Sequence, residues 1–120
     1  MRKLKVLLVD DNEAIRFGFA QYLEREQISV HEAGSLASAR DLVSKQQFDA
    51  LILDLDLPDG DGMDLLADIK ASNPDLPILI VTGSARKTAV ECMSLGADSY
   101  LCKPISMQQL HSSLMQLLKK

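Results

Sequence analysis

Three carboxylates, a hydroxyl and an ammonium follow four short apolar runs of this sequence. These groups belong to Asp10, Asp11, Asp54, Thr82 and Lys103. Mg²⁺ prefers oxygen ligands and commonly binds one or two carboxylates together with water and a substrate phosphate. An aspartate can also act as a nucleophile, while a hydroxyl and an ammonium can donate hydrogen bonds to phosphoryl oxygens. If the ends of the four runs meet in space, these groups form a metal-assisted site for phosphoryl chemistry.

The apolar runs are typical of buried β-strands that alternate with helices. The runs cover residues 6–9, 50–53, 78–81 and 100–102, and a weaker one begins at Ile28. Between the runs, apolar residues recur every three or four positions, as on one face of a helix. Parallel strands require such crossover segments, so the sequence predicts a doubly wound α/β fold with five parallel strands. In open sheets of this kind the site lies at the carboxyl edge.

The expected helices have identifiable starts and ends. Ser35 is the expected N-cap of the second helix, and Ser106 begins a capping box before the last helix. The fourth helix is expected to cover residues 88–95 and to end at Gly96. Residues 58–62 contain only Pro, Asp and Gly, so this segment is predicted to be a loop.

Composition restricts the class of protein. The chain has 120 residues, of which 47% are hydrophobic and 25% charged, and this suits one domain over residues 1–120. Its net charge of −4 argues against a nucleic-acid surface, because phosphate backbones attract basic patches. No apolar run approaches the roughly 20 residues that span a bilayer. We therefore expect a cytoplasmic domain that binds neither nucleic acid nor a membrane.

The sulfur-containing residues and the histidines are expected to be structural. Cys92 and Cys102 are too few for a disulfide framework, and each is expected to pack as a small apolar residue. Four methionines at helical positions are expected to fill the core, namely Met63, Met93, Met107 and Met115. His31 and His111 have no evident partners in the sequence and are not assigned to the site.

Each site residue, taken alone, has an ordinary structural explanation. Paired acids after a strand are often helix N-caps, and an Asp-rich segment such as 54–61 is often a solvated loop. A threonine before a glycine can belong to a turn, and a lysine at a strand end is usually solvated. The agreement of four separate strand ends on complementary groups favours a functional site instead.

The whole chain resembles the receiver domain of two-component response regulators. The matching motifs occur in order, and they are Asp10-Asp11, Asp54 with Pro58 and Gly62, Thr82-Gly83-Ser84, and Tyr100-Leu-Cys-Lys103-Pro104. The resemblance implies a flavodoxin-like (βα)5 fold with strand order 2-1-3-4-5. It also implies a phosphorylation-dependent switch, which catalyses only its own phosphorylation and dephosphorylation and is not otherwise an enzyme.

For the site, the resemblance implies that Asp54 is the phosphoacceptor, which is charged by a histidine kinase or a histidine phosphotransfer protein. Mg²⁺, with Mn²⁺ as an alternative ion, would be bound by the carboxylates of Asp10, Asp11 and Asp54. The backbone carbonyl of Asp56 would complete the protein ligands, with Asp11 preferred over Asp10 as a direct ligand. Asp56 and Ser84 also occupy positions that tune the lifetime of the acylphosphate.

The resemblance further implies how the signal leaves the site. Thr82 and Lys103 would hold the phosphoryl group, and the peptide before Pro104 would be cis. Tyr100 matches the switch aromatic, which changes rotamer as Thr82 moves toward the phosphate. The affected surface would consist of the helix at 88–95, the last strand and the last helix. This surface would bind an effector domain or a target protein, or a second copy of the chain.

The main alternative is a phosphohydrolase of the haloacid dehalogenase type, whose Asp-x-Asp motif Asp54-Leu-Asp56 resembles. That family places its nucleophile first and its acid pair last, whereas here Asp10-Asp11 precede Asp54. A flavin carrier would need a phosphate-binding loop after the first strand, where this chain has acids. A calcium loop beginning at Asp54 would place Pro58 and Leu65 where oxygen ligands are required.

Overall fold

The structure is a computed structural model that describes residues 3–83 and 89–119. A five-stranded parallel sheet lies at its centre in the order β2-β1-β3-β6-β7. The strands are Leu4–Val9 (β1), Ile28–Ala33 (β2), Ala50–Leu53 (β3), Ile78–Thr82 (β6) and Ser99–Cys102 (β7). The helices are Glu13–Arg25 (α1), Leu36–Lys45 (α2), Gly62–Ser72 (α3), Ala89–Ser94 (α4) and Met107–Leu118 (α5). The predicted five-stranded α/β fold and its strand order are confirmed.

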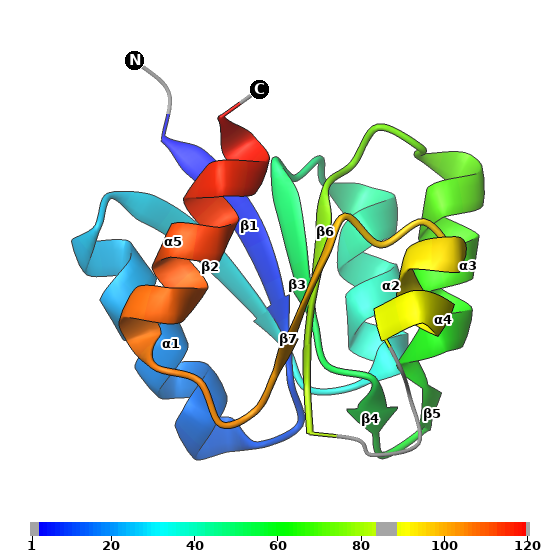
Figure 1. The fold of residues 1–120 in the computed structure, drawn as a ribbon, viewed down its shortest axis with the longest axis horizontal. Helices are drawn as coiled ribbons and strands as arrows, with labels where there is room; N and C mark the ends of the chain where they lie inside the picture. Colours follow the sequence, from blue (N-terminus) through cyan, green and yellow to red (C-terminus); the bar gives the residue numbers. More distant parts are fainter. Residues whose placement is uncertain (1–2, 84–88, 120) are drawn as a thin grey trace.

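Helices cover both faces of the sheet, with α1 and α5 on one face and α2, α3 and α4 on the other (Figure 1). Successive side chains of a strand point to opposite faces. In β1, Val6 and Leu8 therefore pack with α1 and α5, whereas Leu7 and Val9 pack with α2, α3 and α4. Because both faces are buried, the strands read as continuous apolar runs rather than as alternating patterns. Within the described residues, no helix has the length and apolar character needed to span a membrane.

The helix ends follow local sequence signals. The Ser35 side chain accepts a backbone hydrogen bond within the first turn of α2, and Ser106 forms a capping box with Gln109 at α5. Gly96 follows α4 with φ of 107°, a left-handed conformation that favours glycine. The predicted start of this helix at Thr88 lies outside the described residues.

A short antiparallel hairpin shapes the segment that was predicted to be a loop at 58–62. Its strands are Asp56–Leu57 (β4) and Gly60–Asp61 (β5). Between them, the Asp59 carboxylate accepts hydrogen bonds from the backbone N–H groups of Leu36 and Ala37 at 2.8 and 3.1 Å. These two bonds lower the pKa of Asp59. The hairpin that follows the Asp54 strand is thus anchored to the N-terminus of α2.

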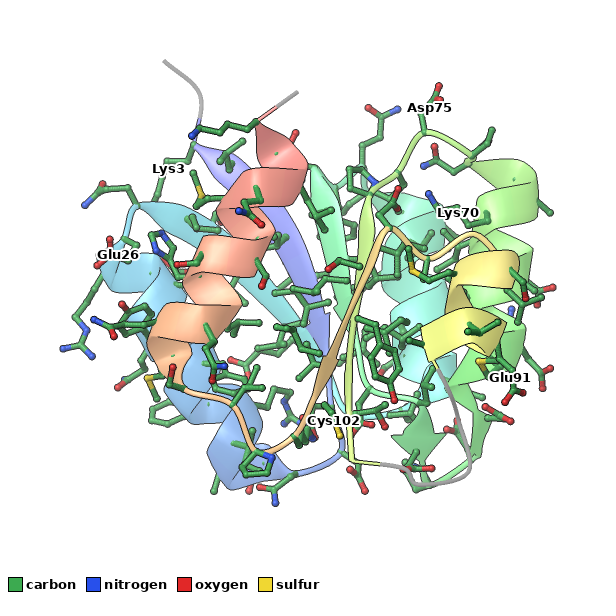
Figure 2. All side chains as sticks on the ribbon, viewed as in Figure 1. Lys3, Glu26, Lys70, Asp75, Glu91 and Cys102 are labelled. Atoms are coloured by element: carbon green, nitrogen blue, oxygen red, sulfur yellow. The ribbon has the colours of Figure 1, made fainter. Side chains whose placement is uncertain are left out.

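We expect Asp59→Asn to lower the free energy of unfolding at neutral pH but not in acid. Because the pKa of Asp59 is lowered in the folded state, its contribution is complete above the ordinary value of 3.8. The contribution is lost as the pH falls below that value through the folded pKa. Urea unfolding followed by circular dichroism, from neutral pH into acid, measures the difference between variant and wild type. Asp75→Asn is the control, because Asp75 projects from the chain between α3 and β6 (Figure 2). A pH-independent deficit in Asp59→Asn would contradict the electrostatic role.

Three sulfur-containing residues differ from the sequence prediction. Cys102 is exposed at the carboxyl edge of the sheet (Figure 2), although Cys92 is buried as predicted. Met93 and Met107 have exposed fractions of 46% and 37%, so they are not core residues, whereas the other two methionines pack against the core. Helical spacing identified the apolar side of each helix, but that side is wider than the stripe that the sheet can cover.

Candidate functional site

The ends of β1, β3 and β7 place an ammonium between two carboxylates at the carboxyl edge of the sheet. The Lys103 Nζ donates to Asp10 Oδ2 at 2.7 Å and to Asp54 Oδ2 at 3.0 Å. Asp10 and Asp54 have exposed fractions of only 3% and 6%. Residues that are distant in sequence therefore converge as the strand ends predicted.

The two carboxylates favour the charged form of Lys103. Burial acts to lower the pKa of its ammonium, but the hydrogen bonds that it donates to Asp10 and Asp54, together with their negative charges, outweigh that effect. The net result is a pKa raised above the usual value for lysine. One positive charge therefore faces two buried carboxylates, and it cannot neutralise both of them.

Asp11 adds a third carboxylate to this site. One carboxylate oxygen of each of Asp10, Asp11 and Asp54 lies within 4.8 Å of the others. Asp11 is exposed and reaches the cluster from the solvent side, unlike the other two. Three hard oxygen donors with excess negative charge suit Mg²⁺ or Mn²⁺ rather than a soft metal. The donor set therefore fits the divalent cation expected from the sequence.

The backbone at Asp56 and at Gly62 lies close to Asp54. The Asp54 Oδ1 accepts a hydrogen bond from the Asp56 N–H at 3.2 Å, and the Asp56 side chain is exposed. At Gly62, which begins α3, a Cβ atom would lie 2.7 Å from the Leu55 Cα and 2.8 Å from the Asp54 carbonyl oxygen. Glycine at this position therefore allows α3 to begin directly against the chain that carries Asp54.

Thr82 and Lys103 lie on adjacent strand ends. Thr82 is the last residue of β6 and is fully buried, and its carbonyl accepts a hydrogen bond from the Lys103 N–H at 2.9 Å. The peptide between Lys103 and Pro104 is cis. Ser84, the third residue of the Thr82 motif, lies outside the described residues.

Tyr100 lies two residues before the end of β7 and opposite Ile80 of β6. Its ring is half-buried against the core formed with α2, α3 and α4. Burial is the main cause that raises the pKa of its hydroxyl, so the phenol stays neutral. Tyr100 shares its sheet face with Thr82.

Sequence reasoning assigned no role to Arg16, which contacts the acid pair, or to Glu32, which bonds Arg16. The Arg16 Nη1 donates to the Asp10 carbonyl oxygen at 2.8 Å, and its Nε donates to Glu32 Oε1 at 3.0 Å. The only sequence signal was the position of Arg16 in the first turns of the helix that follows the acids. That position does not by itself distinguish a contact to the acid pair from a solvated surface charge.

Comparisons with known proteins identify the family. A family model for the response regulator receiver domain matches residues 6–115. The alginate biosynthesis transcriptional regulatory protein AlgB of Pseudomonas putida is 44% identical over 107 residues, covering 88% of this chain and 24% of AlgB. Response regulator protein PilR of Pseudomonas aeruginosa is 32% identical, covering 92% of this chain and 25% of PilR. The chain thus spans about a quarter of the length of these relatives.

Solved structures give the same result. A CheY-like response regulator receiver domain protein from Methanospirillum hungatei superimposes with a TM-score of 0.94 at 28% identity, covering 98% of this chain and 95% of that one. The beryllofluoride-activated NtrC4 receiver domain dimer matches with a TM-score of 0.88 at 31% identity, covering 96% of each chain. With its carboxyl-edge acid cluster, its five-stranded parallel sheet and these matches, this chain belongs to the response regulator receiver domain family.

Proposed function

We propose that this receiver domain is a phosphorylation-dependent signalling switch in which Asp54 accepts a phosphoryl group. The observation that carries the proposal is the Lys103 ammonium, which bonds Asp54 and Asp10 within the acid cluster. The donor is a histidine kinase or a histidine phosphotransfer protein. An Asp54 oxygen forms a bond to phosphorus as the bond between phosphorus and the donor histidine nitrogen breaks, which gives an aspartyl-phosphate.

Mg²⁺ is the proposed cofactor, with Mn²⁺ as an alternative ion. The carboxylates of Asp10, Asp11 and Asp54 and the backbone carbonyl of Asp56 would hold it. When bound, the ion neutralises negative charge on the phosphoryl oxygens. Lys103 would donate hydrogen bonds to the phosphoryl oxygens as well, and its raised pKa keeps its ammonium protonated for this role.

The proposed switch connects the phosphoryl group to Tyr100 through Thr82. The new dianion needs hydrogen-bond donors, and the Thr82 hydroxyl can supply one, because Thr82 ends β6 next to the Lys103 strand end. Movement of Thr82 toward the phosphoryl group leaves space on the same face of the sheet, into which Tyr100 can turn. Phosphorylation would thereby shift a pre-existing equilibrium between two arrangements.

The proposed output surface consists of α4, β7 and α5. On α4, the apolar side chains Val90 and Met93 are exposed, and Leu95 just beyond the helix is exposed as well. Exposed apolar side chains of this kind suit a protein partner, namely an effector domain or a target protein. A second copy of the chain is the alternative partner, and the dimeric state named for the NtrC4 receiver domain supports it.

We further propose that residues 1–120 act as one cytoplasmic receiver unit, which does not itself bind nucleic acid.

We expect the phosphoryl mimic beryllofluoride, added with Mg²⁺, to shift amide resonances in two regions. The first is the neighbourhood of Asp54, and the second includes Tyr100 and α4, because the signal passes through Thr82. In Thr82→Ala the first set of shifts should remain and the second should be lost. Ser72→Ala is the control, because the Ser72 hydroxyl bonds only backbone carbonyls within α3 among the contacts described. Shifts confined to Asp54 in the wild type would mean that the domain stores a phosphoryl group without transmitting a signal.

A further inference from the structure

We propose that Arg16 is a positioning residue that orients the Asp10–Asp11 peptide for metal binding. The proposal rests on the metal site described under the proposed function. One guanidinium group makes two contacts, because Nη1 donates to the Asp10 carbonyl oxygen at 2.8 Å and Nε donates to Glu32 Oε1 at 3.0 Å. Arg16 therefore ties the chain just beyond β1 to the neighbouring strand β2.

Arg16 completes a set of bonds that holds every polar group of Asp10. The Asp10 N–H donates to the Ala33 carbonyl at 3.0 Å. Its Oδ1 accepts from the Asn12 N–H at 2.9 Å, and its Oδ2 accepts from Lys103. Asp10 has left the strand pairing of β1, so its carbonyl has no partner from the sheet ladder and takes Arg16 instead.

The contact to the carbonyl affects the next residue more than Asp10 itself. The Asp10 carbonyl lies in the same planar peptide as the nitrogen and Cα of Asp11. A fixed carbonyl direction therefore fixes the plane from which the Asp11 side chain projects. Asp11 is exposed, so core packing does not restrain its orientation, and the direction of the peptide plane matters more for that reason. Arg16 thus decreases the conformational freedom that Asp11 would lose on binding a metal ion.

Local geometry allows Arg16 to reach this position. Side chains on a helix tilt toward its N-terminus, so a residue in the first turns of α1 can fold back onto the acid pair. Gly34 leaves room for the guanidinium, since a Cβ atom at that position would lie 2.9 Å from the Arg16 Nη1. The side chain is only 17% exposed, whereas Arg40, in its ion pair with Asp68, is 44% exposed. The position of the Arg16 side chain is therefore set by the packing around it, and not only by an ion pair at the surface.

Arg16→Met tests the proposal, because it keeps the length of the side chain and removes the donors. We expect the variant to bind Mg²⁺ about tenfold more weakly, as is typical when an outer partner of a metal ligand is lost. Titration calorimetry below the unfolding temperature measures the affinity. In the metal-free protein, the Asn12 amide should exchange faster with solvent, because its acceptor Asp10 is held less firmly. Arg16→Lys should give an intermediate loss, since a single ammonium cannot reproduce the two-point contact.

Two further variants calibrate these measurements. Asp11→Asn gives the loss of affinity that results from changing a proposed direct ligand. Arg40→Met is the matched control, because it removes another arginine in an ion pair, with the same change of charge, away from the acid pair. Arg40→Met should change neither the Mg²⁺ affinity nor the exchange of the Asn12 amide.

The outcomes separate this proposal from the proposed function. If the wild type binds Mg²⁺ and Arg16→Met matches it in affinity and in Asn12 exchange, the positioning role is wrong, even if the variant is less stable to heat. If the wild type does not bind Mg²⁺, the proposed metal site is wrong. The exchange of the Asn12 amide then remains as the test of whether the Arg16 contact to the Asp10 carbonyl restrains this peptide. In that case, unchanged Asn12 exchange in Arg16→Met would contradict the proposed restraint on the peptide, and faster exchange would support it.

Discussion

In intact-mass spectra, we expect the wild-type chain to gain one phosphoryl group from acetyl phosphate and Mg²⁺, and Asp54→Ala to gain none. Asp54 directly follows the central strand β3, it is almost fully buried, and one of its oxygens accepts a hydrogen bond from the Lys103 ammonium. A carboxylate held beside a cation and two further acids is placed to accept a phosphoryl group from a small donor with the metal ion bound. Full labelling of Asp54→Ala would show that another residue is the phosphoacceptor.

Asp56→Ala is the control for this experiment and also tests the hydrolase alternative. The Asp56 side chain is exposed, and in the proposed function it affects only the lifetime of the acylphosphate, because the proposed metal ligand is its backbone carbonyl. Asp56→Ala should therefore still be labelled once. A phosphohydrolase with the Asp54-Leu-Asp56 motif would instead turn over a generic phosphate ester and would lose that turnover in Asp56→Ala. The wild-type receiver domain should show no sustained turnover of such an ester.

We expect Lys103→Met to lower the free energy of unfolding by about 3 kcal/mol in the absence of divalent cations, since it leaves buried charges without their partner. Asp10 and Asp54 would then face each other without the ammonium that bonds both. Mg²⁺ should decrease the deficit, because it binds the folded state and supplies positive charge to the same carboxylates. Urea unfolding followed by circular dichroism, with a chelator or with Mg²⁺, measures both effects.

Lys45→Met is the control for the stability measurement. Lys45 makes an exposed ion pair with Asp41 one helical turn away on α2, so its loss should have little effect in either condition. An equal and small loss in both lysine variants would show that the Lys103 ammonium does not compensate the buried carboxylates. A Lys103→Met deficit that Mg²⁺ leaves unchanged would place the metal ion elsewhere.

The strands and the carboxyl-edge cluster could be predicted because both depend on patterns that are local in sequence. A sheet buried on both faces leaves continuous apolar runs, and each run ended at a polar residue whose type indicated its chemistry. Asp10, Asp54 and Lys103 lie together for that reason. The N-caps at Ser35 and Ser106 were predictable on the same basis, since a cap depends only on residues of its own first turn.

The contacts that could not be predicted depend on where two distant segments cross. Asp59 is typical of a loop in the sequence, yet its carboxylate caps α2 because the hairpin at 56–61 lies against the N-terminus of that helix. Arg16 reads as a surface charge on α1, yet it contacts Asp10 because Gly34 leaves space beside it. Exposure along the rim of a helix is also a tertiary property, and for this reason Met93 was wrongly predicted to lie in the core.

The register between β6 and β7 restricts where residues can be inserted or deleted near the site. Ile80 lies opposite Tyr100, and Thr82 lies opposite Cys102, so Thr82 and Tyr100 share the face covered by α2, α3 and α4. A single residue inserted between Tyr100 and Lys103 would turn Tyr100 to the opposite face while Lys103 kept its place. Among homologues of this domain, we therefore expect the spacing from Tyr100 to Lys103 to be constant. Insertions and deletions are expected in the connections at the amino edge of the sheet instead.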